Sequence, residues 1–241
     1  MPETVLSVDG LSRSFGGVRA VDGISFDVAE GEIMGVIGPN GAGKSTLFSL
    51  IAGSDRQDAG TVTVLGSRVD RFTPSRRSRL GLARTFQSSQ VFGDSTVADN
   101  LAIAQVAHRT RTGPGRVAEM LDLLDLRGRE NRRAGLLPVY EQQRLAIAMA
   151  LMSGPRLLLL DEPSGGLVEQ EVADLGALLR RVNATGVTLV VIDHKMRLMT
   201  SLCDRILVMA SGAPLALGTP AEVTADAAVR AAYLGERGEP A

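Results

Sequence analysis

Alternating apolar and polar residues mark the start of the chain. The alternation over residues 5–8 and 24–28 predicts short strands of an antiparallel β edge. Residues 33–37 form an apolar run that predicts a buried strand, and a glycine-rich loop joins it to a helical pattern over 44–52 that ends at Gly53. A strand, a loop and a helix in this order form the smallest unit of an α/β fold.

Helical spacing dominates the middle of the chain. Residues 73–133 are rich in Arg, Ala and Leu, and apolar residues recur every three or four positions over 117–124. The remaining predicted elements are a helix over 142–152, a strand over 157–160, a helix over 168–183 and a strand over 187–192. Strands that alternate with helices predict a largely parallel sheet covered on both faces. We therefore expect a single α/β domain over residues 1–241, with an antiparallel β edge and an inserted α-helical subdomain at roughly 73–152.

Composition excludes several classes of protein. There are 26 Lys and Arg residues against 27 Asp and Glu, a formal net charge of −1, so no overall field draws the chain to nucleic acid, and we expect no nucleic-acid partner. The longest uncharged run, residues 206–221, is interrupted by glycine and proline and is shorter than the about 20 apolar residues of a membrane-spanning helix. The start of the chain lacks a signal-peptide pattern, and Cys203 is the only cysteine. These features predict a cytoplasmic protein without structural disulfides.

A phosphate-binding motif follows the strand predicted over 33–37. Residues 38–45 satisfy the pattern G-x-x-x-x-G-K-[ST] between a predicted strand and a predicted helix, the context that the motif requires. Backbone N–H groups of such a loop converge on a nucleotide phosphate, while Lys44 reaches the β and γ oxygens and the Ser45 hydroxyl binds Mg²⁺. A glycine-rich turn without a ligand is the alternative, but chance places the full motif in well under about 1% of such sequences. The candidate nucleotide-binding residues are Gly38, Pro39, Asn40, Gly41, Ala42, Gly43, Lys44, Ser45 and Thr46.

Two acidic residues follow the strand predicted over 157–160. This run of four leucines delivers Asp161 and Glu162 to the carboxyl end of a buried strand, where α/β sheets bind their ligands. There Asp161 can hold Mg²⁺ through its water shell, and Glu162 can orient the attacking water or accept its proton. Solvated acids at a strand end are the alternative interpretation.

Together these motifs resemble those of the ATP-binding cassette (ABC) ATPases over nearly the whole chain, which implies a P-loop NTPase core. The resemblance implies that Gln87 contacts Mg²⁺ and the attacking water, that His194 reaches the γ-phosphate, and that Phe15 stacks on adenine. Taken singly, each has a simpler interpretation: a solvated loop glutamine, a structural histidine and a core phenylalanine. His108 matches no family position, and we expect it to be exposed. The candidate catalytic residues are thus Gln87, Glu162 and His194, and the candidate Mg²⁺ ligands are Ser45, Gln87 and Asp161.

Further sequence segments indicate which subgroup of the family this chain resembles. Residues 83–87, which read Ala-Arg-Thr-Phe-Gln, the segment 91–101 and the ending 218–235 resemble the ATPases of branched-chain amino-acid importers. Urea and amide importers and the lipopolysaccharide-export ATPase share parts of these strings, so the solute stays open. The resemblance implies ATP and Mg²⁺ as cofactors and a place on the inner face of the cell membrane. The implied partners are transmembrane permease subunits, a second ABC ATPase and, indirectly, a periplasmic solute-binding protein.

One motif departs from the family. The segment 137–141 reads Leu-Pro-Val-Tyr-Glu where the family has its L-S-G-G-Q signature, which acts on the nucleotide of the partner cassette. Pro138 removes a hydroxyl and a backbone donor, Tyr140 adds bulk, and Glu141 adds negative charge. Val168 likewise replaces an aspartate that the family commonly has. We therefore expect a heterodimer with a cassette that has a complete signature; a tolerated variation with a working helix N-terminus is the alternative.

In the family that this chain resembles, a short helix of the permease docks beside the segment that corresponds to residues 87–101. Val91, Phe92 and Val97 are expected to be exposed there as a docking patch, and the alternative is that they fill the core of the helical subdomain.

The favoured function is the ATP-hydrolysing subunit of an importer. A nucleotide-dependent regulatory module of low turnover is the main alternative, and a cassette that acts on DNA or ribosomes is disfavoured by the neutral net charge.

Overall fold

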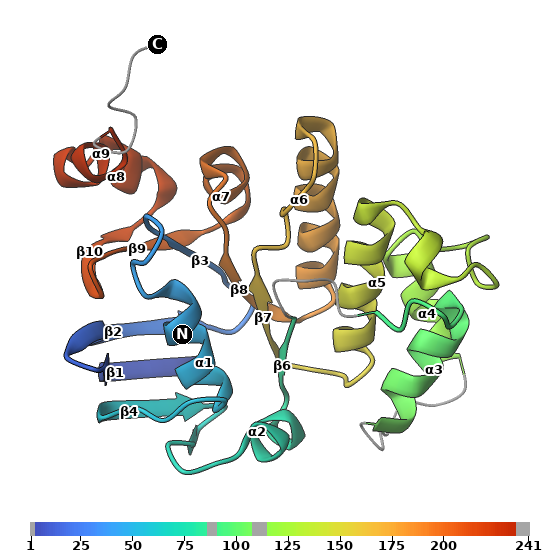
Figure 1. Cartoon of the computed structure of the whole chain (residues 1–241), viewed down its shortest axis with the longest axis horizontal. Helices are drawn as coiled ribbons and strands as arrows, with labels where there is room; N and C mark the ends of the chain where they lie inside the picture. The colour runs from blue at the N-terminus through green and yellow to red at the C-terminus, as the bar shows by residue number, and fades with distance from the viewer. Residues whose placement is uncertain (1–2, 86–90, 108–114, 235–241) are drawn as a thin grey trace.

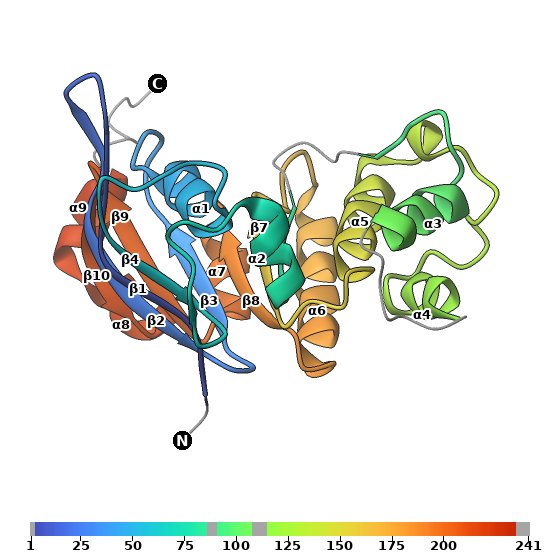
Figure 2. The ribbon, with the colours of Figure 1, turned by 90° about the horizontal axis from the view of Figure 1, so that it is seen from below.

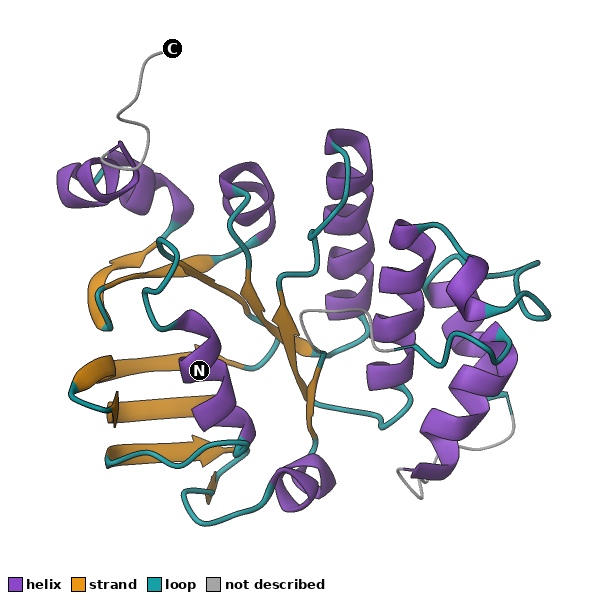
Figure 3. Ribbon diagram, in the orientation of Figure 1, coloured by secondary structure: helices purple, strands orange, loops and turns teal. Residues whose placement is uncertain are grey.

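A computed structural model describes residues 3–85, 91–107 and 115–234, and within these residues the strands form two sheets (Figures 1 and 3). The larger sheet contains, in spatial order, β10 (Ala213–Gly218), β9 (Arg205–Ala210), β3 (Ile33–Ile37), β8 (Thr188–Ile192), β7 (Leu157–Asp161) and β6 (Leu82–Arg84). Neighbouring strands from β9 to β6 are parallel, and only β10 runs antiparallel to its neighbour within the described sheet. The predicted parallel sheet is confirmed.

The N-terminal antiparallel strands form a second, smaller sheet beside the larger one. Its order is β2 (Val18–Ala29), β1 (Thr4–Phe15), β4 (Ala59–Val64) and β5 (Ser67–Arg68). Gly16 and Gly17 join β1 to β2 with φ angles of 52° and 91°, the left-handed backbone that a tight two-residue hairpin requires. Since β1 pairs with β4 along its other edge, the hydrogen bonds of β1 are used within this smaller sheet.

The described helices cover the sheets and extend beyond them (Figures 1 and 2). They are α1 (Lys44–Ala52), α2 (Pro74–Leu80), α3 (Val97–Ala107), α4 (Arg116–Leu123), α5 (Val139–Leu151), α6 (Glu169–Ala184), α7 (Met196–Leu202), α8 (Pro220–Ala225) and α9 (Ala227–Leu234), with a 3₁₀ turn at Ala134–Leu136. None of these helices is both long and apolar enough to span a bilayer.

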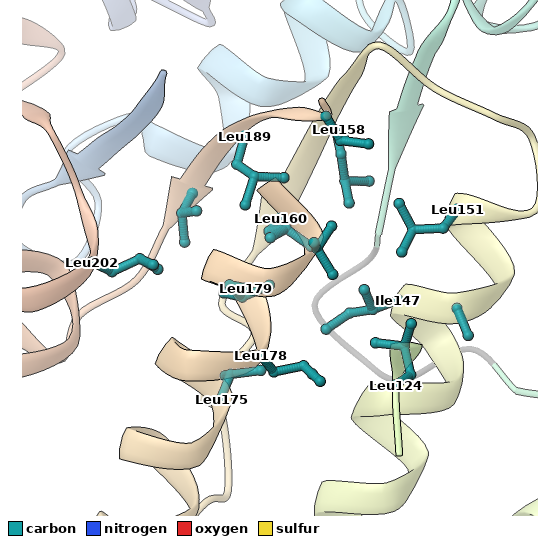
Figure 4. Close-up of a cluster of buried hydrophobic side chains, with 14 of the residues drawn as sticks. Leu124, Ile147, Leu151, Leu158, Leu160, Leu175, Leu178, Leu179, Leu189 and Leu202 are labelled. Atoms are coloured by element: carbon teal, nitrogen blue, oxygen red, sulfur yellow. The ribbon is translucent and has the colours of Figure 1, made fainter. Parts of the chain in front are cut away.

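The four leucines of β7 divide the hydrophobic core into two clusters. All four are fully buried, and successive side chains of a strand point to opposite faces. Leu157 and Leu159 pack in the cluster formed with α1 and the smaller sheet, whereas Leu158 and Leu160 pack in the cluster formed with α5, α6 and α7. Figure 4 shows the second cluster. Burial of each leucine contributes about 1.5–3 kcal/mol to folding, so this strand is a rigid support for the residues that follow it.

Helices α3, α4 and α5 gather on the side of the molecule away from the smaller sheet (Figure 1). Their buried residues belong to the same cluster as Leu158 and Leu160, and α5 lies against α6 and the parallel sheet (Figure 4). The sequence pattern did not predict β6, a short strand within 73–152 that pairs with β7 in the larger sheet. Helix α2 therefore precedes a strand of the core and helices α3, α4 and α5 follow it, and the boundaries of a subdomain stay a prediction.

Candidate nucleotide-binding site

The parallel strands deliver the predicted site residues to one edge of the larger sheet. The phosphate-binding loop follows β3, His194 follows β8, and Asp161 and Glu162 lie at the end of β7. Strands β3, β8, β7 and β6 are consecutive neighbours, and their carboxyl ends meet at this edge. The topology thus brings together residues that are more than 100 positions apart in the sequence.

The phosphate-binding loop is held in shape by Lys44 and by two glycines. Lys44 is buried, and its Nζ donates hydrogen bonds to the carbonyl oxygens of Gly38 and Pro39 at 2.7 and 2.9 Å. A Cβ on Gly38 would lie 2.2 Å from a carbonyl oxygen of β9, and a Cβ on Gly43 would lie 2.0 Å from the carbonyl oxygen of Ala20. Because no side chain fits in this space, the loop packs directly on the backbones of β2 and β9.

The loop ends at the N-terminus of α1. Gly43 is the N-cap residue, and no side chain caps the first N–H groups of the helix. Uncapped N–H groups and the positive end of the helix dipole attract phosphate oxygens. Ser45 is exposed in the first turn of this helix, where its hydroxyl is available to a bound metal ion.

Asp161 is buried with 4% of its surface exposed. Its Oδ2 accepts a hydrogen bond from Arg84 Nη2 at 2.8 Å, whereas its Oδ1 is buried without a hydrogen-bond partner among the described residues. A buried carboxylate oxygen without a donor is costly unless water or a cation binds it, and Mg²⁺ prefers oxygen ligands. The chemistry of this oxygen therefore fits Mg²⁺ or a water molecule of its shell.

Glu162 has a backbone conformation that is rare for a residue with a side chain. Its φ angle is 48°, and its N–H donates to the carbonyl oxygen of Ile192 at 2.8 Å. A left-handed conformation at a non-glycine residue costs on the order of 1–3 kcal/mol, and such strain is concentrated at functional sites. The hydrogen bond ties Glu162 to the end of β8, two residues before His194.

His194 lies between two residues that are bound to the segment after Glu162. Asp193 is fully buried and accepts hydrogen bonds from the Ser164 hydroxyl at 2.7 Å and the Ser164 N–H at 3.0 Å. Lys195 Nζ donates to the carbonyl oxygen of Leu167 at 2.6 Å. The His194 side chain is 56% exposed, so its neighbours hold the backbone while the imidazole stays accessible.

Phe15 lies near the tip of the β1–β2 hairpin and is 45% exposed. The guanidinium of Arg13 lies 4.6 Å from the centre of its ring. The core alternative for Phe15 is therefore wrong, and the exposed ring is compatible with a stacking role. The same hairpin approaches the phosphate loop where Ala20 contacts Gly43. Gln87 and His108 lie outside the described residues, so their roles stay predictions.

The altered signature segment differs from the expectation in two respects. Tyr140 is only 8% exposed and packs in the core, so its ring does not add bulk on the outer surface, and burial raises the pKa of its hydroxyl. Glu141 forms an ion pair with Arg129 at 3.0 Å, so its negative charge is compensated. Pro138 is the N-cap of α5 without a side-chain hydrogen bond, and Val139 and Val168 are exposed. This segment therefore presents less bulk and less uncompensated negative charge to a phosphate than the sequence indicated. It still lacks the serine hydroxyl of the family signature.

The predicted docking patch is also smaller than expected. Val97 is fully buried, and Val91 is partly buried against the same core, so for these two residues the core alternative is correct. Phe92 is 51% exposed. The buried Asn100 holds the backbone that presents this ring, because its Oδ1 accepts from the Phe92 N–H at 2.7 Å and its Nδ2 donates to the Phe92 carbonyl at 3.0 Å.

Comparison with known proteins identifies the family of this chain. Residues 21–165 match the family described as ABC transporter, and residues 210–239 match the family described as branched-chain amino acid ATP-binding cassette transporter. The chain therefore belongs to the ABC transporter family and is an ATPase of that family.

Relatives and solved structures match along nearly the whole chain. The high-affinity branched-chain amino acid transport ATP-binding protein BraF of Pseudomonas aeruginosa is 36% identical over 98% of this chain and 100% of its own length. The corresponding protein LivG of Escherichia coli is 35% identical with the same coverage. The ADP conformation of an ATP-binding cassette of an ABC transporter superposes with a TM-score of 0.89 and 28% identity, covering 97% of this chain and 99% of that one.

Proposed function

We propose that this chain is the ATP-hydrolysing subunit of an importer for branched-chain or related amino acids. One observation carries the proposal: Lys44, Asp161, Glu162 and His194 converge at one edge of the sheet in a chain whose relatives are named as branched-chain amino acid transport proteins. ATP hydrolysis would supply the energy, and membrane permease partners would carry the solute. The permease would hold the chain at the inner face of the cell membrane.

Mg²⁺ would be held by the Ser45 hydroxyl and by Asp161, with Gln87 as a third group. When bound, the ion would neutralise charge on the β and γ phosphates. Lys44 would leave the Gly38 and Pro39 carbonyls for phosphate oxygens, which are stronger acceptors because they are charged. Glu162 would accept a proton from the attacking water as oxygen bonds to the γ-phosphorus and the bond to the bridging oxygen breaks, giving ADP and phosphate. His194 would donate to a γ-phosphate oxygen.

The permease would dock on the surface around Phe92. Ile103 and Val106 of α3 are 41% and 77% exposed, and Asn100 of the same helix holds the backbone of Phe92. Exposed apolar side chains on adjacent segments support an interface. Phe92→Asp should detach the chain from membranes that contain the permease while ATP binding is kept. Leu217→Asp, at an exposed apolar position on β10, is the matched control and should stay bound.

Pairing with a different cassette would explain the altered signature. The described groups that we propose to bind this chain's own nucleotide lie at one edge of the larger sheet, whereas Pro138 and Val139 offer no hydroxyl to a nucleotide held by a partner. In such a heterodimer, Lys44→Ala here should remove most of the hydrolysis, and the equivalent change in the partner should be milder. Because Tyr140 is a core residue, a restored signature should be built as Pro138→Ser with Val139→Gly only. Equal effects of the two lysine changes would refute the asymmetry.

Transport is the direct test of the proposal. The tagged chain would be purified with the membrane and ATPase proteins that accompany it, and the complex would be reconstituted into proteoliposomes with its solute-binding protein. We expect uptake of labelled leucine that requires ATP and is lost in Lys44→Ala. A complex that binds ATP but shows neither uptake of any branched-chain amino acid nor turnover would support the low-turnover regulatory module instead.

A further inference from the structure

Arg84 and Asp161 face each other across two neighbouring parallel strands. Arg84 lies opposite Leu159 in the register of β6 and β7, and Asp161 is two residues further along β7. Side chains two residues apart lie on the same face of a strand, so Asp161 shares the face of Leu159. Leu159 packs in the cluster that contains α1, which places the carboxylate on the side of the phosphate-binding helix.

The guanidinium of Arg84 links this carboxylate to α1. Nη2 contacts Asp161 Oδ2 at 2.8 Å, and the two side chains are only 12% and 3% exposed. Nη1 lies 3.3 Å from the Ser49 hydroxyl, which donates to the carbonyl oxygen of Ser45 at 2.9 Å. The guanidinium also lies 5.9 Å from the ring centre of Phe48. Arg84 is therefore anchored on both sides, to the end of β7 and to the helix that carries Ser45.

This arrangement gives the two oxygens of Asp161 different surroundings. Oδ2 is bound to a cation of the protein itself, and Oδ1 is buried without a hydrogen-bond partner among the described residues. The burial of a carboxylate with so little exposure is costly, and a partner charge offsets part of that cost. The same partner repels a second cation, because charges that share one buried carboxylate interact strongly at low dielectric.

We propose that Arg84 is a positioning residue that holds Asp161 ready for Mg²⁺ and, through its charge, weakens the binding of that ion. The inference rests on the Mg²⁺ site of the proposed function. As a consequence, Mg²⁺ and ADP dissociate more easily than they would if no protein cation were paired with Asp161. Arg84 does not itself touch the nucleotide in this account.

The test compares charge with hydrogen bonding. Arg84→Gln keeps a donor for Oδ2 but removes the charge, whereas Arg84→Lys keeps the charge. The readout is the affinity for a fluorescent ADP analogue as a function of Mg²⁺ concentration, so no activity is needed. We expect half-saturation at about tenfold lower Mg²⁺ in Arg84→Gln and within about threefold of wild type in Arg84→Lys. Dissociation of the analogue in Mg²⁺ should be correspondingly slower in Arg84→Gln.

A double-variant cycle completes the test. With Asp161→Asn, the further change Arg84→Gln leaves no buried charge in the pair, and we expect no tightening of Mg²⁺ binding. If Arg84→Gln alone does not fold, Arg84→Met replaces it, because it also removes the charge, and we expect the same tightening of Mg²⁺ binding. Unchanged or weaker Mg²⁺ dependence in folded Arg84→Gln, or tightening that persists without Asp161, would overturn the proposal. If the wild type binds the nucleotide with an affinity that does not depend on Mg²⁺, and Asp161→Asn leaves that affinity unchanged, the Mg²⁺ site of the proposed function is wrong. This inference then fails with it.

Discussion

Arg77 of α2 provides a sharp test of how the phosphate-binding helix is held. The side chain is 1% exposed, and its guanidinium donates to four backbone carbonyl oxygens. Two of them, at Leu50 and Ile51, belong to the last turn of helix α1 and lie at 2.6 and 2.7 Å. The others, at Val69 and Phe72, lie at 2.8 and 3.2 Å in the connection between β5 and α2. One cation thus joins the end of α1 to the segment that leads into α2.

The expected effect of Arg77→Met follows from these partners. The carbonyls of Leu50 and Val69 also accept backbone N–H groups, so the substitution chiefly deprives those of Ile51 and Phe72. A buried carbonyl without a donor costs about 1–3 kcal/mol, or about 2–6 kcal/mol for two. Methionine also removes a cation whose burial lowers the pKa of Arg77, and this relief offsets part of the loss. We therefore expect a loss of about 2–4 kcal/mol, a large share of the about 5–15 kcal/mol of a typical domain.

Urea unfolding followed by far-ultraviolet circular dichroism measures this loss, since the chain has no tryptophan. Arg79→Met is the matched control on the same helix, because Arg79 is exposed, and its effect should stay within about 0.5 kcal/mol. Arg77→Lys keeps the charge with fewer donors and should be intermediate. An Arg77→Met variant as stable as Arg79→Met would refute the reasoning.

Three further predictions concern packing, thiol chemistry and pH. Gly43→Ala would place a Cβ 2.0 Å from the carbonyl oxygen of Ala20 at a φ of 97°, so affinity for a fluorescent ATP analogue should fall at least about tenfold; equal affinity would contradict the close packing. Burial raises the pKa of Cys203 to about 12, so the folded chain should react with a thiol reagent at least about 100-fold more slowly than the chain in urea; rapid labelling of the folded chain would be inconsistent with this burial. A hydrogen bond from the Ser14 N–H and a neighbouring guanidinium lower the pKa of Asp58 from 3.8, so its stabilisation is present above that pH and is lost as pH falls through the lower value. Urea midpoints of Asp58→Asn and wild type should therefore differ at pH 7 and converge in strong acid, and a constant difference would exclude this linkage.

The sequence was sufficient to predict the elements that carry the motifs. Residues 33–37 and 44–52 are observed as β3 and α1 with the predicted bounds, and the leucine strand predicted over 157–160 extends one residue further, to Asp161. These segments are predictable because each has a strong local signal, a short apolar run or a glycine-rich loop followed by a helix. Parallel strands then bring their carboxyl ends to one edge, which is a general property of the architecture.

The features that the sequence did not reveal depend on tertiary contacts. Arg84 was visible only as part of a family string, and its pairing with Asp161 depends on the register of β6 and β7. Tyr140 and Val97 turn into the core because of how α5 and α3 pack, which local pattern does not determine. The left-handed backbone conformation of Glu162 could not be predicted from its residue type, because glycine is the residue that usually adopts this conformation.

The central claim is that this chain hydrolyses ATP with Glu162 at the edge of the parallel sheet. The most direct measurement compares ATP binding and steady-state phosphate release for wild type and Glu162→Gln in the purified transport complex. Glu169→Gln, a change at an exposed acid on α6, is the control and should match wild type. The account predicts that Glu162→Gln binds ATP within about threefold of wild type and hydrolyses it at least about 100-fold more slowly. Hydrolysis at the wild-type rate by Glu162→Gln would contradict it.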